Sequence, residues 1–152
     1  KLVQSSGLSC EQIVIELSEK YPFPYDDMLK NALDKYKQFG FKVAIDDLGA
    51  GYSGLKQWSQ LRPDIVKIDR YFVENCHQDD FKAKFIKAMF DLGDAANSKV
   101  IVEGIETKEE YDCLFALGMR YVQGYYLARP VEFPIKNFNQ LRLNLKNTVQ
   151  AA

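Results

Sequence analysis

The chain has 152 residues, which is enough for one domain with a sizeable hydrophobic core. Hydrophobic residues make up 47% of it, charged residues 27%, and the formal net charge is -1, so no basic excess indicates a nucleic-acid partner. No apolar run approaches the roughly 20 residues that span a bilayer, and no secretory signal leads the chain.

The three cysteines, Cys10, Cys76 and Cys113, are far apart and lack the spacing of metal ligands. We therefore expect reduced thiols and a cytoplasmic location. The first residue is Lys1 rather than Met, so we also expect the chain to be part of a longer protein.

Short apolar runs alternate with amphipathic stretches along the chain. The apolar runs predict strands at 12–16, 43–45, 63–68, 99–103 and from 121 to 123. The amphipathic stretches predict helices ending near Gly7 and at 25–39, 55–61, 80–96, 107–117 and 134–147. Strict alternation of strand and helix is typical of an α/β fold with a parallel sheet covered by helices.

Polar residues stand at the ends of all five predicted strands, namely Glu16, Asp46, Lys67, Glu103 and Gln123. Their spacing averages about 27 residues, close to the roughly 30 residues per unit of a (β/α)₈ barrel. Because the carboxyl ends of parallel strands meet at one mouth of such a barrel, we expect these side chains to converge on a site.

The segment FKVAIDDLGAGYSGL places two adjacent acids directly after an apolar strand. Gly49 and Gly51 then permit a sharp loop, since glycine adopts backbone angles that other residues resist. Two readings of the pair remain open from these residues alone. Asp47 caps a helix while Asp46 pairs with a lysine, or both acids hold metal ions.

Four carboxylates, on Glu16, Asp46, Asp47 and Glu103, supply only oxygen ligands. Such donors suit Mg²⁺ or Mn²⁺ better than zinc or copper. The adjacent pair can serve two ions about 3.5–4 Å apart, as in two-metal phosphoester hydrolysis. Glu103 is either a ligand or a general base, and its spacing does not decide between them.

Two further residues have both a catalytic and a structural interpretation. Lys67 either holds an attacking water or neutralises phosphate charge, or it forms a salt bridge to Asp69 or Asp46. Gln123 can both donate and accept hydrogen bonds, so it suits recognition of a base or sugar, or it bonds to backbone at the strand end.

Five segments together resemble the EAL-domain family of bacterial cyclic di-GMP phosphodiesterases, in the family's order and over about 115 residues. They are IELSE (15–19), DDLGAGYSGL (46–55), DIVKID (64–69), VEGIET (102–107) and QGYYLARP (123–130). The resemblance implies a TIM-like (β/α)₈ barrel, a divalent-metal site, and cleavage of cyclic di-GMP to the linear dinucleotide pGpG.

The resemblance also implies a role for each matching residue. Metal ligands would be Glu16, Asp46 and Asp47; Lys67 would contact the catalytic water; Glu103 would be ligand or base; Gln123 and Asp69 would lie at the substrate; Glu19 and Glu106 would hold the loop after Asp47. In the family this loop, here 48–54, is a lid and part of a dimer contact, so a homodimer is expected.

Two departures from the family pattern bear on the extent of the domain. The loop reads DLGAG where DFGTG is common, and neither the Glu-Ala-Leu signature nor the asparagine ligand of the following strand occurs. We therefore expect residues 1–152 to be the C-terminal part of one EAL domain, with a motif-bearing core at 12–133 and a C-terminal helix at 134–147. This part would supply five βα units of an incomplete barrel and would be inactive alone, with a sensory or GGDEF-type domain possible upstream.

Three other functions compete with hydrolysis. A degenerate EAL domain would bind cyclic di-GMP as a receptor without cutting it. An enolase-like barrel would use Lys67 as its base, but the adjacent acids and glycine-rich loop fit that poorly. A receiver-type phosphoacceptor also uses an Asp pair and a Lys, but there the pair ends the first strand, whereas here another strand precedes it.

Overall fold

One parallel sheet of five strands organises the part of the chain that the computed structural model describes, residues 2–20, 27–51 and 54–132. The strands follow one another in chain order across the sheet. They are β1 (Val14–Ser18), β2 (Lys42–Leu48), β3 (Ile65–Ile68), β4 (Lys99–Val102) and β5 (Tyr121–Val122). Every adjacent pair is parallel, as in a barrel wall.

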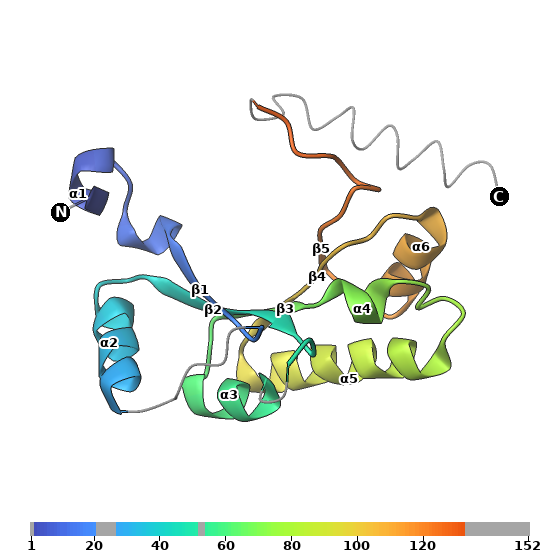
Figure 1. The fold of residues 1–152 in the computed structure, drawn as a ribbon, viewed down its shortest axis with the longest axis horizontal. Helices are drawn as coiled ribbons and strands as arrows, with labels where there is room; N and C mark the ends of the chain where they lie inside the picture. Colours follow the sequence, from blue (N-terminus) through green and yellow to red (C-terminus); the bar gives the residue numbers. More distant parts are fainter. Residues whose placement is uncertain (1, 21–26, 52–53, 133–152) are drawn as a thin grey trace.

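Several of the helices between the strands cover one face of the sheet, while a short helix and a 3₁₀ turn precede β1 (Figure 1). They are α1 (Leu2–Ser6), the 3₁₀ turn η1 (Cys10–Gln12), α2 (Asp27–Gln38), α3 (Gly54–Leu61), α4 (Arg70–Val73), α5 (Asp80–Ala96) and α6 (Lys108–Ala116). Figure 1 shows α2, α3 and α5 beneath the sheet, while the N-terminal arm and the segment after β5 rise on the opposite side. This arrangement confirms the predicted α/β fold, a partial TIM-like barrel.

Alternate residues along each strand face the helices and form the core. Ile45, Val66 and Val102 are fully buried there, together with Ile86 of α5. Trp58 of α3 lies in the same cluster. Burying one such side chain contributes about 1.5–3 kcal/mol, so this face holds the strands in position for the polar residues on the other.

The differences from the sequence prediction include two strand boundaries and one additional short helix. β1 begins at Val14 rather than at residue 12, because Cys10–Gln12 form a 3₁₀ turn. β2 continues through the acid pair to Leu48 instead of ending at residue 45. The short helix α4 was not predicted. The expected C-terminal helix lies outside the described residues.

Of the helices within the described ranges, none has the length and apolar character needed to cross a membrane.

Candidate active site

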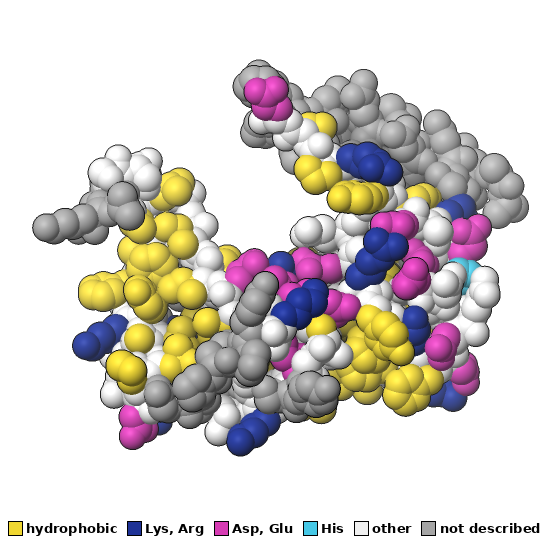
Figure 2. Space-filling view, in the orientation of Figure 1, with side chains coloured by type: hydrophobic (Ala, Val, Ile, Leu, Met, Phe, Trp, Pro, Cys, Tyr) yellow, Lys and Arg dark blue, Asp and Glu magenta, His cyan; other side chains and the backbone are white. Residues whose placement is uncertain are grey.

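The sheet face opposite the core collects charged side chains. Because side chains alternate across a strand, Glu16, Asp46, Lys67 and Glu103 point away from the helices that their neighbours contact. Figure 2 shows acidic and basic groups gathered in the hollow between the N-terminal arm and the segment after β5. The structure thus brings together side chains from four successive strand ends.

Lys67 lies at the centre of this group. Its Nζ is 2.9 Å from Glu103 Oε1, 3.0 Å from Asp46 Oδ1 and 3.3 Å from Glu16 Oε2. Burial alone would lower the pKa of Lys67, but Glu103 and Asp46 raise it well above its usual value. Lys67 therefore stays protonated and neutralises acids from three strands.

Two carboxylate oxygens of this group are buried without a hydrogen bond. They are Asp46 Oδ1 and Glu103 Oε1, and each lies close to Lys67 Nζ but outside hydrogen-bonding geometry. Burial raises the pKa of Glu103, and Lys67 offsets part of that rise. A buried carboxylate needs a nearby positive charge, and Lys67 Nζ supplies it to both oxygens.

Asp47 lies at the same mouth as Asp46 because β2 is irregular. Ile45 pairs with Val66 and Leu48 with Ile68, so β2 has one more residue than β3 across this interval. Asp47 has φ 58°, a left-handed conformation that is uncommon outside glycine. A regular strand would place Asp47 on the helix-facing side, so the bulge brings both acids to the same end of the strand, beside different lysines.

Asp47 meets a second lysine. Lys20 Nζ is 2.7 Å from Asp47 Oδ1 and 3.2 Å from Asp69 Oδ2. Ser18 Oγ donates to Asp47 Oδ2 at 3.1 Å. Burial alone would raise the pKa of Asp47, but the Lys20 and Ser18 contacts hold it below its usual value. Lys20 was not singled out from the sequence, where its only signal is its place beside Glu19.

Glu19 lies under the loop that follows Asp47. Its side chain is buried, and it accepts hydrogen bonds from the backbone N–H of Gly49 at 2.7 Å and of Gly54 at 2.5 Å. Gly49 has φ 98°, and a Cβ there would lie 2.2 Å from the Phe72 ring, so only glycine fits. Glu106, the other predicted loop anchor, pairs with Arg70 Nη1 at 2.6 Å.

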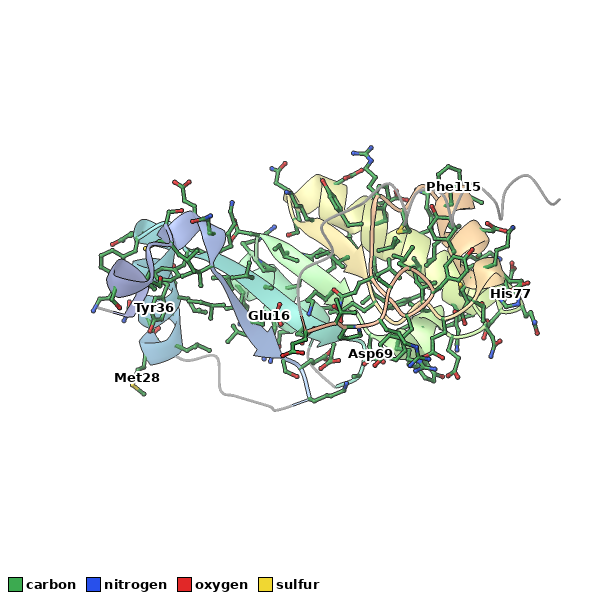
Figure 3. The ribbon with its side chains drawn as sticks, turned by 90° about the horizontal axis from the view of Figure 1, so that it is seen from above. Glu16, Met28, Tyr36, Asp69, His77 and Phe115 are labelled. Carbon is green, nitrogen blue, oxygen red and sulfur yellow. The ribbon has the colours of Figure 1, made fainter. Side chains whose placement is uncertain are left out.

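A hollow of about 310 Å³ adjoins both lysine-centred groups. It is lined by Lys20, Asp47, Asp69, Arg70, Glu103, Gly104, Glu106, Gln123, Gly124 and Tyr125. The predicted substrate residues Gln123 and Asp69 are therefore both at its wall. Figure 3 shows Glu16 and Asp69 in the middle of the molecule, with Tyr36 near one end and Phe115 near the other.

A divalent cation fits the chemistry of these donors. They are hard carboxylate oxygens, and two are buried without a hydrogen bond. Within the described ranges, no three His, Cys, Asp or Glu side chains are arranged to hold one metal ion. The acids instead surround Lys67 and Lys20.

Comparisons with known proteins agree on one family. The model of the EAL domain matches residues 1–130. In Escherichia coli K12, a probable cyclic di-GMP phosphodiesterase, PdeA, is 31% identical over 130 residues, 86% of this chain and 18% of its own length. A second, PdeG, is 35% identical over 121 residues, 80% of this chain and 24% of its own.

Solved structures give the same answer. The manganese and cyclic di-GMP complex of Klebsiella pneumoniae BlrP1 matches with a TM-score of 0.80 and 33% identity, covering 84% of this chain and 33% of that one. The same protein with calcium and cyclic di-GMP matches with a TM-score of 0.79 at 33% identity, over 84% of this chain and 32% of that one. The chain thus spans a quarter or less of the two curated relatives and about a third of this structure.

Proposed function

The chain belongs to the EAL domain family, and on this premise we propose that it supplies five strands of a metal-dependent phosphodiesterase domain that cleaves cyclic di-GMP to linear pGpG. One observation carries the proposal. Acids from β1, β2 and the end of β4 meet a single lysine of β3 at one edge of the sheet. In (β/α) barrels, the catalytic residues lie at the carboxyl ends of the strands, which is where these charges converge.

The residues that would hold Mg²⁺ or Mn²⁺ are Glu16, Asp46, Asp47 and Glu103. When bound, the cations would activate water and neutralise charge on the phosphodiester. The hard carboxylate oxygens, gathered at neighbouring strand ends, support this assignment. A two-metal site is proposed for the intact domain, because the described residues do not by themselves surround one ion.

Lys67 would balance negative charge at the site, and Glu103 would accept a proton or bind a cation. Lys67 keeps its proton because its pKa is raised, so it would hold the attacking water through hydrogen bonds and balance phosphate charge. Glu103, whose pKa burial raises, would take a proton from that water or serve as a ligand. Lys67 Nζ and Glu103 Oε1 lie 2.9 Å apart, so one water molecule could contact both groups.

The hollow beside these groups would receive the substrate. Gln123 and Asp69 line it from the ends of β5 and β3, and Tyr125 offers an aromatic face half-exposed to solvent. Arg70 adds a positive charge at the same wall. An amide, a carboxylate and a ring suit a guanine base, and the cation suits phosphate.

The chain alone would not turn over substrate in this proposal. The five strands in the described part of the chain would leave a barrel open, because about eight are needed to close one. In the intact protein, the loop held by Glu19 would act as a lid. That protein would be cytoplasmic and dimeric, and a sensory or GGDEF-type domain would precede this one.

A receptor that binds cyclic di-GMP without cutting it is the second candidate. One observation favours it: Lys20 and Lys67 form ion pairs with Asp47 and Asp46, the acids that would hold divalent cations in an enzyme. Hydrolysis is preferred because the chain retains Glu16, Asp46, Asp47, Lys67 and Glu103, and a receptor would need no such cluster of acids.

Turnover of cyclic di-GMP with Mn²⁺ by the full-length protein tests the proposal, with a Glu103→Gln variant as comparison. We expect pGpG from the wild type and a loss of about 10²-fold or more in the variant, typical of removing a base or ligand. Binding of cyclic di-GMP without any pGpG would favour the receptor. No binding and no turnover would reject both functions.

A further inference from the structure

Lys20 bridges two carboxylates that come from different strands. Its Nζ is 2.7 Å from Asp47 Oδ1, at the bulge of β2, and 3.2 Å from Asp69 Oδ2, just after β3. The lysine follows β1, so three neighbouring strand ends meet at its ammonium group. It also lines the 310 Å³ hollow.

All four oxygens of this acid pair already have a protein partner. Asp47 Oδ2 accepts from Ser18 Oγ at 3.1 Å, and Asp69 Oδ1 accepts from the N–H of Tyr71 at 2.8 Å. Lys20 contacts the other oxygen of each acid.

The three donors differ in how freely they can leave. Ser18 is fixed within β1, and the N–H of Tyr71 belongs to the first turn of α4. The Lys20 side chain is 52% exposed and sits on a flexible four-carbon stem, so it can swing into solvent. Lys20 and Asp47 both line the hollow, so a cation that enters it to reach Asp47 is repelled by the Lys20 charge.

We propose that Lys20 is a tethered cation that occupies the Asp47–Asp69 pair and must be displaced before a divalent cation can bind Asp47. The inference rests on the proposed function for the presence of that cation. It makes Lys20 a residue that sets metal affinity without being a ligand.

The size of the effect follows from exposure. A half-exposed ion pair contributes little because water and salt screen it, and a nearby positive charge repels a divalent cation by a similar amount. Removing the Lys20 charge should therefore tighten Mn²⁺ binding by about three- to tenfold.

The test measures Mn²⁺ affinity of the full-length protein by electron paramagnetic resonance of free Mn²⁺. Lys20→Met should bind three- to tenfold more tightly, and Lys20→Arg should stay near wild type because the charge is kept. Lys42→Met is the matched control, since Lys42 is 50% exposed and pairs with Asp64 at 3.8 Å, outside the site. Its affinity should stay within about twofold of wild type.

A second measurement uses the wild type alone, so it does not depend on a variant folding. Acetylation of Lys20, followed by mass spectrometry with Lys42 as internal reference, should speed up several-fold when saturating Mn²⁺ is added. An unchanged labelling rate would overturn the inference. So would equal affinity in Lys20→Met and wild type, or the absence of Mn²⁺ binding in Lys20→Met.

These results separate from those for the proposed function. Cyclic di-GMP turnover by the full-length protein, with unchanged Mn²⁺ affinity in Lys20→Met, would reject only the role of Lys20. Tighter Mn²⁺ binding with no turnover would reject the enzyme and leave the role of Lys20 intact.

Discussion

Replacing Lys67 by Met removes the charge that three carboxylates share while keeping an unbranched side chain. Lys67 is 14% exposed, and its Nζ lies within 3.3 Å of all three acids. Removing one partner of a buried ion pair costs about 3–5 kcal/mol. Because Glu16 is 46% exposed and Asp46 keeps 23% exposure, solvent will screen part of this. We expect a loss of about 2–3 kcal/mol in the free energy of unfolding at pH 7.

The loss should depend on pH in a defined direction. Burial raises the pKa of Glu103, and Lys67 is what pulls it back down. Without Lys67 that pKa rises further above its unfolded value. The folded variant then holds more protons than the unfolded chain between the two values, so its stability increases as pH falls through this window. The gap between variant and wild type should therefore narrow from pH 7 towards pH 4.

Urea unfolding followed by circular dichroism at pH 7 and pH 5 measures the loss in the free energy of unfolding and its dependence on pH. Lys42→Met serves as control, since it also removes one strand lysine and one ion pair but lies half-exposed outside the site. The control should show no measurable loss. A loss below about 0.5 kcal/mol for Lys67→Met at pH 7, or an equal loss at both pH values, would refute the assignment of Lys67 as the shared counter-charge.

Three further outcomes are expected. In the full-length protein, Asp46→Asn or Asp47→Asn should abolish hydrolysis, and near-normal turnover in either variant would rule out the two-metal assignment. Ca²⁺ should bind yet inhibit, because it prefers longer bonds and more ligands; equal rates in Ca²⁺ and Mn²⁺ would contradict this. Glu110→Gln should cost about 2 kcal/mol, since the buried Glu110 accepts three backbone N–H bonds. Although burial opposes it, these bonds lower the Glu110 pKa, so chemical denaturation should show its stabilisation lost as pH falls below about 4.5.

The convergence of the strand-end residues could be predicted from the sequence. The pattern of apolar strand followed by a polar residue is local, and parallel topology brings such ends to one edge whatever the packing details. Glu16, Asp46, Lys67 and Glu103 do lie together, with Lys67 in contact with all three acids. The interpretation of Lys67 as partner of Asp46 was made from the sequence and agrees with the 3.0 Å contact.

The contacts of Asp47 could not be predicted in this way. They depend on a register shift between β2 and β3 and on a left-handed backbone at Asp47, neither of which local sequence encodes. Lys20 was overlooked for the same reason, since its partners Asp47 and Asp69 are 27 and 49 positions away. The four-residue helix α4 is too short to show a helical pattern of apolar residues, so the sequence does not predict it. Its start is marked by the Asp69 side chain, which accepts a hydrogen bond from the N–H of Tyr71.

The bulge in β2 determines where the neighbouring residues Asp46 and Asp47 lie in the proposed metal site. Two consecutive residues of a regular strand face opposite sides of the sheet, so a regular β2 could present only one of the two acids at the mouth. The extra residue and the positive φ of Asp47 bring both acids to the same end, but to different lysines. Each acid thus begins with its own counter-charge. A divalent cation would have to compete with Lys20 at Asp47 and with Lys67 at Asp46. Because Lys20 is 52% exposed and Lys67 only 14%, the lysine at Asp47 should be the easier of the two to displace.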